Sequence, residues 1–152
     1  MIRKNRINKI NQNKFETELG KLSKKSHDFI GIVDLKNVTN DESFINEVAK
    51  SLGAPKEHSI YSENLSAFSD YINELPWFET GQKYSAYWLF VKNFDKMKIK
   101  DGESGWSGEE RKQHYYEIFR DDLVKWWTED IAKYGGIKGR EHVRDFTVIF
   151  VE

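Results

Sequence analysis

The last strand-like segment of the chain reads Phe146-Thr147-Val148-Ile149-Phe150-Val151, an almost unbroken apolar run. A second run of this kind, YSAYWLFV, occupies residues 84–91. Strands that are apolar at nearly every position are typical of parallel sheets, because helices cover both faces of such sheets. The two runs therefore predict an α/β domain that is built on a parallel sheet.

The residues before these runs supply a third strand and two crossover helices. Residues 28–35, DFIGIVDL, are β-branched and aromatic and predict a strand, which we expect to be the central one. A helix then follows a capping box formed by Thr39 and Glu42 and ends at Gly53. Its apolar positions recur at helical spacing and are Phe44, Ile45, Val48, Ala49 and Leu52.

Two further helices complete the pattern. The first is capped by Ser62 and ends near Pro76, and its buried stripe consists of Leu65, Phe68, Ile72 and Leu75. The second runs from about residue 109 to residue 134, where Trp127 continues the apolar stripe and Trp126 should be the more exposed indole. We therefore expect a three-stranded parallel sheet with helices packed on its faces.

Charge is distributed unevenly along the 152 residues, which are enough for one domain. The net charge of −1 divides into +6 for residues 1–26 and −7 for residues 27–152. This division predicts a basic N-terminal arm, 1–26, and a globular domain, 27–152. We expect the arm to form a weak helix that is only loosely attached, so that its removal leaves the domain folded.

Several classes of function lack their residues. The chain has no Cys, and its four His form no zinc motif. No combination of nucleophile, base and orienting group is recognisable, so we expect neither an enzyme nor a cofactor. No apolar run reaches the ~20 residues of a membrane span, and no signal peptide is evident, which favours a cytoplasmic protein with no membrane contact.

The helix that follows Ser62 carries an acidic face. At ~100° per residue, Asp70 lies about 160° from both Phe68 and Ile72 and should therefore point into solvent. The residues that face away from the buried stripe are Glu63, Ser66, Asp70, Asn73 and Glu74.

This helix also carries a recognisable motif. The stretch Tyr61-Ser62-Glu63-Asn64-Leu65-Ser66-Ala67-Phe68-Ser69-Asp70 resembles the signature of the barstar family of bacterial ribonuclease inhibitors, roughly Tyr-Gly-x-Asn-x-Asp-Ala-Leu-x-Asp. The family's order of strands and helices also fits residues 28–152. Tyr61, Asn64, Ala67 and Asp70 match the signature, while Ser62, Ser66 and Phe68 replace its Gly, its first Asp and its Leu.

The resemblance implies a barstar-like fold and a cytoplasmic immunity protein, or antitoxin, that blocks the active site of a toxin ribonuclease. By this resemblance Asp70 enters the phosphate pocket of the enzyme. A Glu on the long helix also takes part, for which Glu129 is the closest candidate and Asp121 or Asp122 are alternatives. The implied partner-binding residues are Tyr61, Asn64, Ser66, Ser69, Asp70, Asn73, Glu74 and Glu129.

The expected partner is a basic extracellular or toxin ribonuclease, bound by protein–protein interaction to a chain that is a monomer when free. Because Ser66 and Ser69 depart from the family's residues, we expect a basic nuclease other than barnase. The alternative hypothesis is a nucleic-acid-binding or regulatory module that uses the basic arm.

Overall fold

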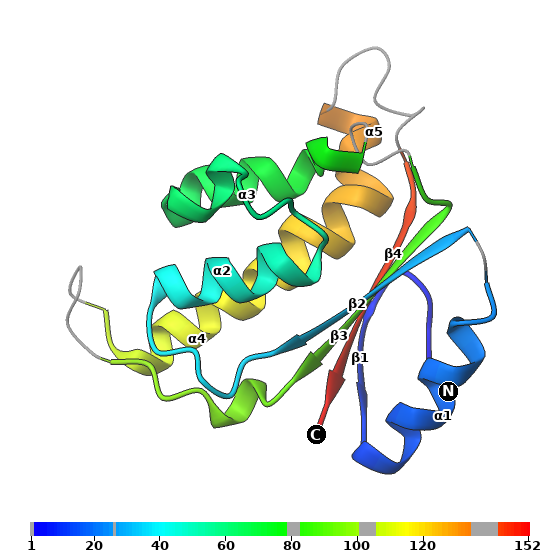
Figure 1. The fold of residues 1–152 in the computed structure, drawn as a ribbon, viewed down its shortest axis with the longest axis horizontal. Helices are drawn as coiled ribbons and strands as arrows, with labels where there is room; N and C mark the ends of the chain where they lie inside the picture. Colours follow the sequence, from blue (N-terminus) through cyan, green and yellow to red (C-terminus); the bar gives the residue numbers. More distant parts are fainter. Residues whose placement is uncertain (1, 26, 79–82, 101–105, 135–142) are drawn as a thin grey trace.

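The computed structural model describes residues 2–25, 27–78, 83–100, 106–134 and 143–152. They form one parallel sheet with helices on both faces (Figure 1). The strands lie in the order β1-β4-β3-β2. Their bounds are β1 (Ile7–Ile10), β2 (Asp28–Asp34), β3 (Ala86–Lys92) and β4 (Asp145–Val151).

The prediction of an α/β parallel sheet is confirmed, but two of its details are wrong. The sheet has four strands instead of three, and β2 lies at an edge instead of the centre. The central strands are β3 and β4, which are buried along almost their whole length. β2 suits an edge because Ile32 is 44% exposed there and an Asp stands at each end of the strand.

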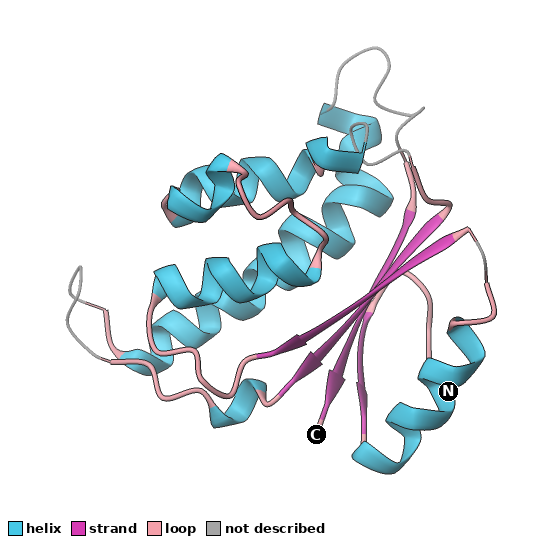
Figure 2. Cartoon of the chain, viewed as in Figure 1, coloured by secondary structure: helices cyan, strands magenta, loops and turns pink. Residues whose placement is uncertain are grey.

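The helices are divided unequally between the two faces (Figures 1 and 2). Among the described helices, only α1 covers one of the two faces. None of the described helices is long and apolar enough to cross a membrane. The α-helices are α1 (Gln12–Leu22), α2 (Asp41–Ser51), α3 (Leu65–Glu74), α4 (Gly108–Glu117) and α5 (Ile131–Tyr134). Short 3-10 turns are η1 (Ser59–Ser62), η2 (Pro76–Phe78) and η3 (Phe94–Lys96), and η5 (Ile118–Asp130) is π-helical.

Alternation along β3 connects the two halves of the core. Tyr87 and Leu89 belong to the large cluster beneath α2, α3 and the long helix. Trp88 and Phe90 belong to a second cluster beneath α1. The central strands are therefore apolar on both sides because each side meets a different helical layer.

The N-terminal segment contributes a strand to this sheet. β1 runs parallel to β4, with Ile7 opposite Val148 and Ile10 opposite Val151. Before β1, the side chain of Asn5 accepts a hydrogen bond from the backbone N–H of Phe146 at 2.9 Å.

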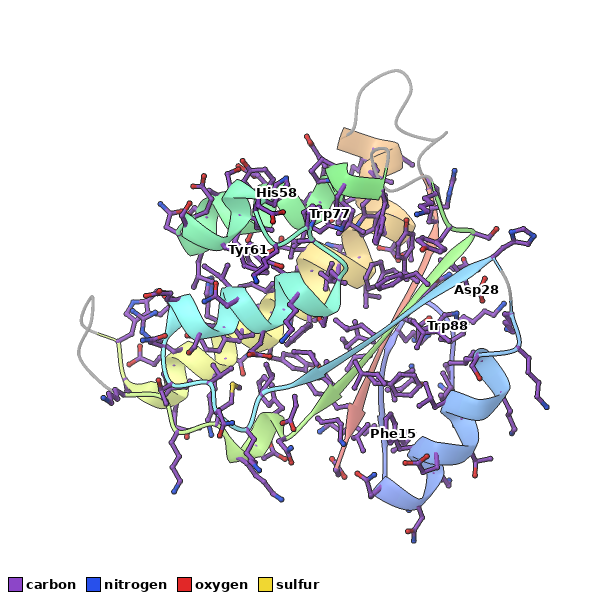
Figure 3. The ribbon with its side chains drawn as sticks, in the orientation of Figure 1. Phe15, Asp28, His58, Tyr61, Trp77 and Trp88 are labelled. Atoms are coloured by element: carbon purple, nitrogen blue, oxygen red, sulfur yellow. The ribbon has the colours of Figure 1, made fainter. Side chains whose placement is uncertain are left out.

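The weak helix expected in this segment is present as α1, but the expected loose attachment is wrong. The ring of Phe15 is buried and meets Phe90 edge-on at 5.1 Å between centroids. Leu22 is also buried in this cluster, and Figure 3 shows Phe15 on the same side of the sheet as Trp88. The apolar side chains of α1 are needed to cover a face of β3 and β4 that would otherwise meet water.

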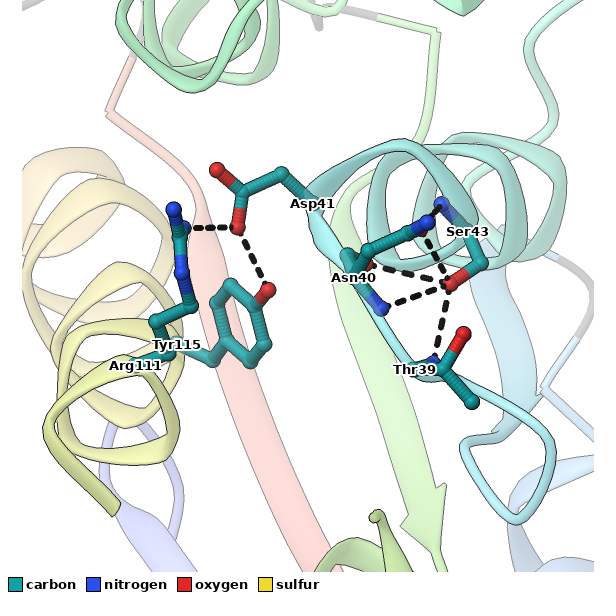
Figure 4. Close-up of polar contacts among 6 residues, drawn as sticks. All are labelled: Thr39, Asn40, Asp41, Ser43, Arg111 and Tyr115. Atoms are coloured by element: carbon teal, nitrogen blue, oxygen red, sulfur yellow. Dashed lines mark hydrogen bonds and ion pairs between the residues drawn. The ribbon is translucent and has the colours of Figure 1, made fainter. Parts of the chain in front are cut away.

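The start of α2 differs in detail from the prediction. Its capping box is formed by Asn40 and Ser43 instead of Thr39 and Glu42. The carboxylate of Asp41 accepts hydrogen bonds from Arg111 and from the hydroxyl of Tyr115 (Figure 4). This contact fastens the start of α2 to α4.

The other end of α2 depends on a glycine in β2. A Cβ added at Gly31 would lie 2.4 Å from the carbonyl oxygen of Ser51, so only glycine allows the helix to approach the strand this closely.

The long helix is continuous through α4, η5 and α5, but its middle part winds as a π-helix, which the apolar pattern did not indicate. The backbone N–H of Ile131 bonds to the carbonyl of Trp126, five residues earlier. Trp127 is fully buried and Trp126 is partly exposed, so the predicted order of exposure is confirmed.

Substitution of Phe15 tests whether α1 belongs to the core. Phe15→Ala should lower the free energy of unfolding by about 3–5 kcal/mol, because it removes a buried ring from a packed cluster. Deletion of residues 1–24 should prevent stable folding for the same reason. The measurement is urea unfolding, with Lys14→Ala as the control because Lys14 is exposed on the same helix turn. A Phe15→Ala protein as stable as Lys14→Ala would contradict this packing.

Candidate functional site

α3 owes its position to its cap and to two buried side chains. The side chain of Asn64 accepts a hydrogen bond from the backbone N–H of Ala67 at 2.9 Å, so Asn64 is the N-cap instead of Ser62. Phe68 and Ile72 are fully buried beneath the helix. α3 ends at Leu75, whose backbone is left-handed with φ of 45°, directly before Pro76.

Two adjacent indoles fix the C-terminal end of α3 against the long helix. Trp126 donates its Nε1–H to the carbonyl of Asn73 at 2.8 Å, and Trp127 donates to the carbonyl of Ile72 at 3.0 Å. Carbonyls in the last turn of a helix lack partners within the helix. The indoles therefore satisfy these carbonyls and hold α3 in one register along η5.

This register brings acidic side chains of the two helices together. Ser69 on α3 forms a side-chain hydrogen bond to Asp122 on η5, and the charges of Asp70 and Asp121 act on the same carboxylate. Burial raises the pKa of Asp122, and the nearby negative charges of Asp121 and Asp70 raise it further. The hydrogen bond from Ser69 and the charge of His114 oppose this shift.

Asp121 is in a different electrostatic state from its neighbour. Arg120 donates to both of its carboxylate oxygens, at 2.8 and 2.9 Å. These hydrogen bonds lower the pKa of Asp121. Asp121 is thus already paired with a cation, whereas Asp122 stands among other carboxylates.

The structure separates the residues expected to bind a partner into three groups. Ser66, Asp70 and Glu74 are exposed on α3, and Ser69 is partly exposed beside them. Glu129 is exposed on η5, about two helical turns beyond Asp122. The alternative acid Asp122, and not Glu129, is the one that the structure connects to Ser69 and Asp70.

The remaining residues have contacts within the chain. Tyr61 donates its hydroxyl to the carbonyl of Ala54 at 2.9 Å and anchors the loop that leads into α3. Asn64 acts as the cap, and the backbone carbonyl of Asn73 binds Trp126.

Asp122, an alternative to Glu129 in the sequence, is the acid of the long helix that interacts with Ser69 and Asp70. It lies 52 positions after Asp70, so nothing in the apolar pattern places the two side by side. Among the described residues, no group of three or more His, Asp or Glu is arranged to hold a metal ion.

Comparison with known protein families gives one match. The model of the Barstar family, described as barstar (barnase inhibitor), matches residues 29–132. This range contains α2, α3 and η5, and it leaves out β1, α1 and β4. No curated protein and no solved structure matches the chain.

The pKa values of Asp121 and Asp122 shift in opposite directions, so the two residues should affect stability in opposite ways. Because folding raises the pKa of Asp122, ionised Asp122 destabilises the protein above that pKa, and this penalty disappears as the pH falls toward the ordinary value. Asp122→Asn should therefore raise the free energy of unfolding at neutral pH. The gain should vanish in acid.

Asp121→Asn is the matched comparison. The lowered pKa of Asp121 means that its ionised form stabilises the fold above the ordinary pKa, and this stabilisation is lost as the pH falls. The substitution should lower stability at neutral pH. Urea unfolding at about pH 7 and about pH 2.5, below the ordinary carboxyl pKa, measures both effects, and equal losses for the two variants would contradict the assignment for Asp122.

Proposed function

The chain belongs to the Barstar family, and we propose that it is an immunity protein that binds and blocks the active site of a toxin ribonuclease. The observation that carries the proposal is the acidic seam, defined as Asp70 with Asp122 across the junction of α3 and η5. Asp70 is exposed at the surface of the seam, on the part of the chain that the family model covers.

The chemistry of the seam suits a ribonuclease active site. Such a site holds Lys, Arg and His side chains that are arranged to bind phosphate. A carboxylate presents oxygen acceptors to the same donors and forms charge-assisted hydrogen bonds with them. Residues 27–152, which include both helices of the seam, carry −7, while the +6 of residues 1–26 lies with β1 and α1 across the sheet from α3. The acidic side would attract a basic enzyme and speed the encounter.

The seam distinguishes the roles of the acids. Asp70 is the central contact, and Asp122 supports it from the long helix. Glu74 and Ser66 lie exposed on the same helix and fit the rim of the interface. A role for Glu129 stays a prediction, because the residue lies further along η5.

The partner follows from the same charges. We infer a basic ribonuclease, of the kind used as a secreted toxin, that the producing cell must inhibit in its own cytoplasm. Ser66 and Ser69 bring no charge or aromatic ring to the interface, so the partner must be recognised mainly through Asp70 and its acidic neighbours. This requirement favours a cognate enzyme other than barnase.

Asp70→Ala is the direct test. Removal of the carboxylate would leave cations of the enzyme desolvated and unpaired, at a cost of about 2–5 kcal/mol in affinity, mainly through faster dissociation. This range is typical of buried charge pairs in protein complexes, including those of this inhibitor family. Stability should change by no more than about 0.5 kcal/mol, because Asp70 is exposed. Inhibition kinetics on the cognate ribonuclease and urea unfolding measure the two effects.

Three further variants define the interface. Ser66→Ala should weaken inhibition less than Asp70→Ala, and Glu129→Ala should fall between them if Glu129 reaches the enzyme. Glu16→Ala, an exposed acid on α1, is the matched control and should inhibit as the wild type does. Unchanged inhibition by Asp70→Ala would overturn the interface, and failure of the wild type to bind any ribonuclease would overturn the function.

A further inference from the structure

A cleft of about 400 Å³ opens at the carboxyl ends of β1, β3 and β4. The C-terminus marks this end of the sheet in Figure 1, away from α3. Its volume is within the range of small-molecule sites, and ligands of parallel α/β sheets bind beyond the carboxyl ends of the strands. Part of its wall comes from β1 and α1, which lie outside the family match.

Three aromatic rings form one wall of the cleft. Tyr116 stacks on Phe150 with 5.8 Å between ring centroids and an angle of 27°. Phe94 meets Phe150 edge-on at 5.2 Å. Phe94 and Tyr116 are both partly exposed in the cleft, and their rings stand at 70° to each other.

Three lysines surround this wall. Lys9 and Lys96 are exposed at the rim, and Lys92 is partly buried, with its ammonium 5.2 Å from the ring centroid of Phe15. Among the described residues, none of the three lies within ion-pair distance of a carboxylate. Asp95 and Glu152 also line the cleft, so the ionised side chains of the lining sum to +1.

Asn93 fixes the segment that leads from β3 into η3, which forms part of the cleft wall. Asn93, which follows β3, has a left-handed backbone with φ of 61°. Its side-chain amide donates to the carboxylate of Asp34 at 2.7 Å, and this hydrogen bond lowers the pKa of Asp34. Asn93 thereby turns the chain so that Phe94 and Lys96 face the cleft from η3.

We propose that this cleft binds a mononucleotide. The base stacks on the ring of Phe94, with Tyr116 at its edge because the two rings stand at 70° to each other, and the phosphate binds the ammonium groups of Lys9 and Lys96. The mixed charge of the rim favours this ligand over a simple anion, because Asp95 and Glu152 can accept hydrogen bonds from ribose hydroxyls. A nucleotide has all three chemical elements, namely a planar ring, an anion and neutral donors.

Calorimetric titration of the full chain tests the proposal with three ligands. Adenosine 5′-monophosphate carries both the base and the phosphate, adenosine lacks the phosphate, and ribose 5-phosphate lacks the base. The mononucleotide should bind at least about tenfold more tightly than either fragment, since stacking and charge contribute separately. Equal binding of ribose 5-phosphate and the mononucleotide would show that the aromatic wall is not used and would overturn the proposal. Absence of binding at about 10 mM would overturn it as well.

Variants assign the binding to this cleft. Lys9→Glu combined with Lys96→Glu should weaken the mononucleotide by about tenfold or more, because the anion then meets two like charges. Lys98→Glu is the control, since Lys98 is exposed nearby and does not line the cleft. Equal affinity of the double variant and the wild type would reject the cleft. Ribonuclease inhibition should be the same in all three proteins, so this test is independent of the acidic seam.

Discussion

The two central strands must be covered on both faces, and the rest of the architecture follows from this constraint. On one side, Tyr87 of β3 stacks on Phe146 of β4 with 5.4 Å between ring centroids, beneath the long helix. On the other side, Phe90 meets Phe15 of α1. A chain that contained only the residues of the family match would leave the second face without this cover. The N-terminal strand and helix are therefore explained by burial, even though their composition is that of a charged arm.

The acidic seam depends on a second constraint, which is the placement of α3. A short helix whose apolar side chains could pack in several registers is fixed here by directional bonds from Trp126 and Trp127 to its terminal carbonyls. Hydrogen bonds are far more sensitive to position than apolar contact is. Asp122, one turn before these indoles, consequently accepts a hydrogen bond from Ser69 and lies within the electrostatic influence of Asp70. The same bonds that stabilise the core thus set the geometry of the acids.

The sequence predicted the elements better than their arrangement. The spacing of apolar residues and the positions of Gly and Pro located the helices and the three long strands. The same spacing predicted that Asp70 is exposed and that Trp126 is more exposed than Trp127. β1 was missed because it has only four residues and lies within a charged segment, where pairing partners decide the structure more than propensity does. The edge position of β2 and the neighbour of Asp70 on η5 depend on contacts between distant segments, which no local pattern encodes. The spacing of apolar residues also did not predict the π-helical winding of η5 or the choice of Asn64 over Ser62 as the N-cap of α3.

If the acidic seam is the interface, its instability in the free protein is part of how it works. Asp122 is partly buried, and burial together with the charges of Asp121 and Asp70 raises its pKa, so that folding disfavours its ionised form. An opposite charge brought close by a partner would remove the repulsion and favour the ionised form. The free energy stored against folding would then return as binding energy, without any rearrangement of the helices. Binding sites that are prepared in this way lower stability in exchange for affinity.

A cation of the protein itself would remove this advantage. Asp121 is in that position, because Arg120 already neutralises its charge. The residue next to it in sequence is therefore the better placed of the two to bind a basic enzyme.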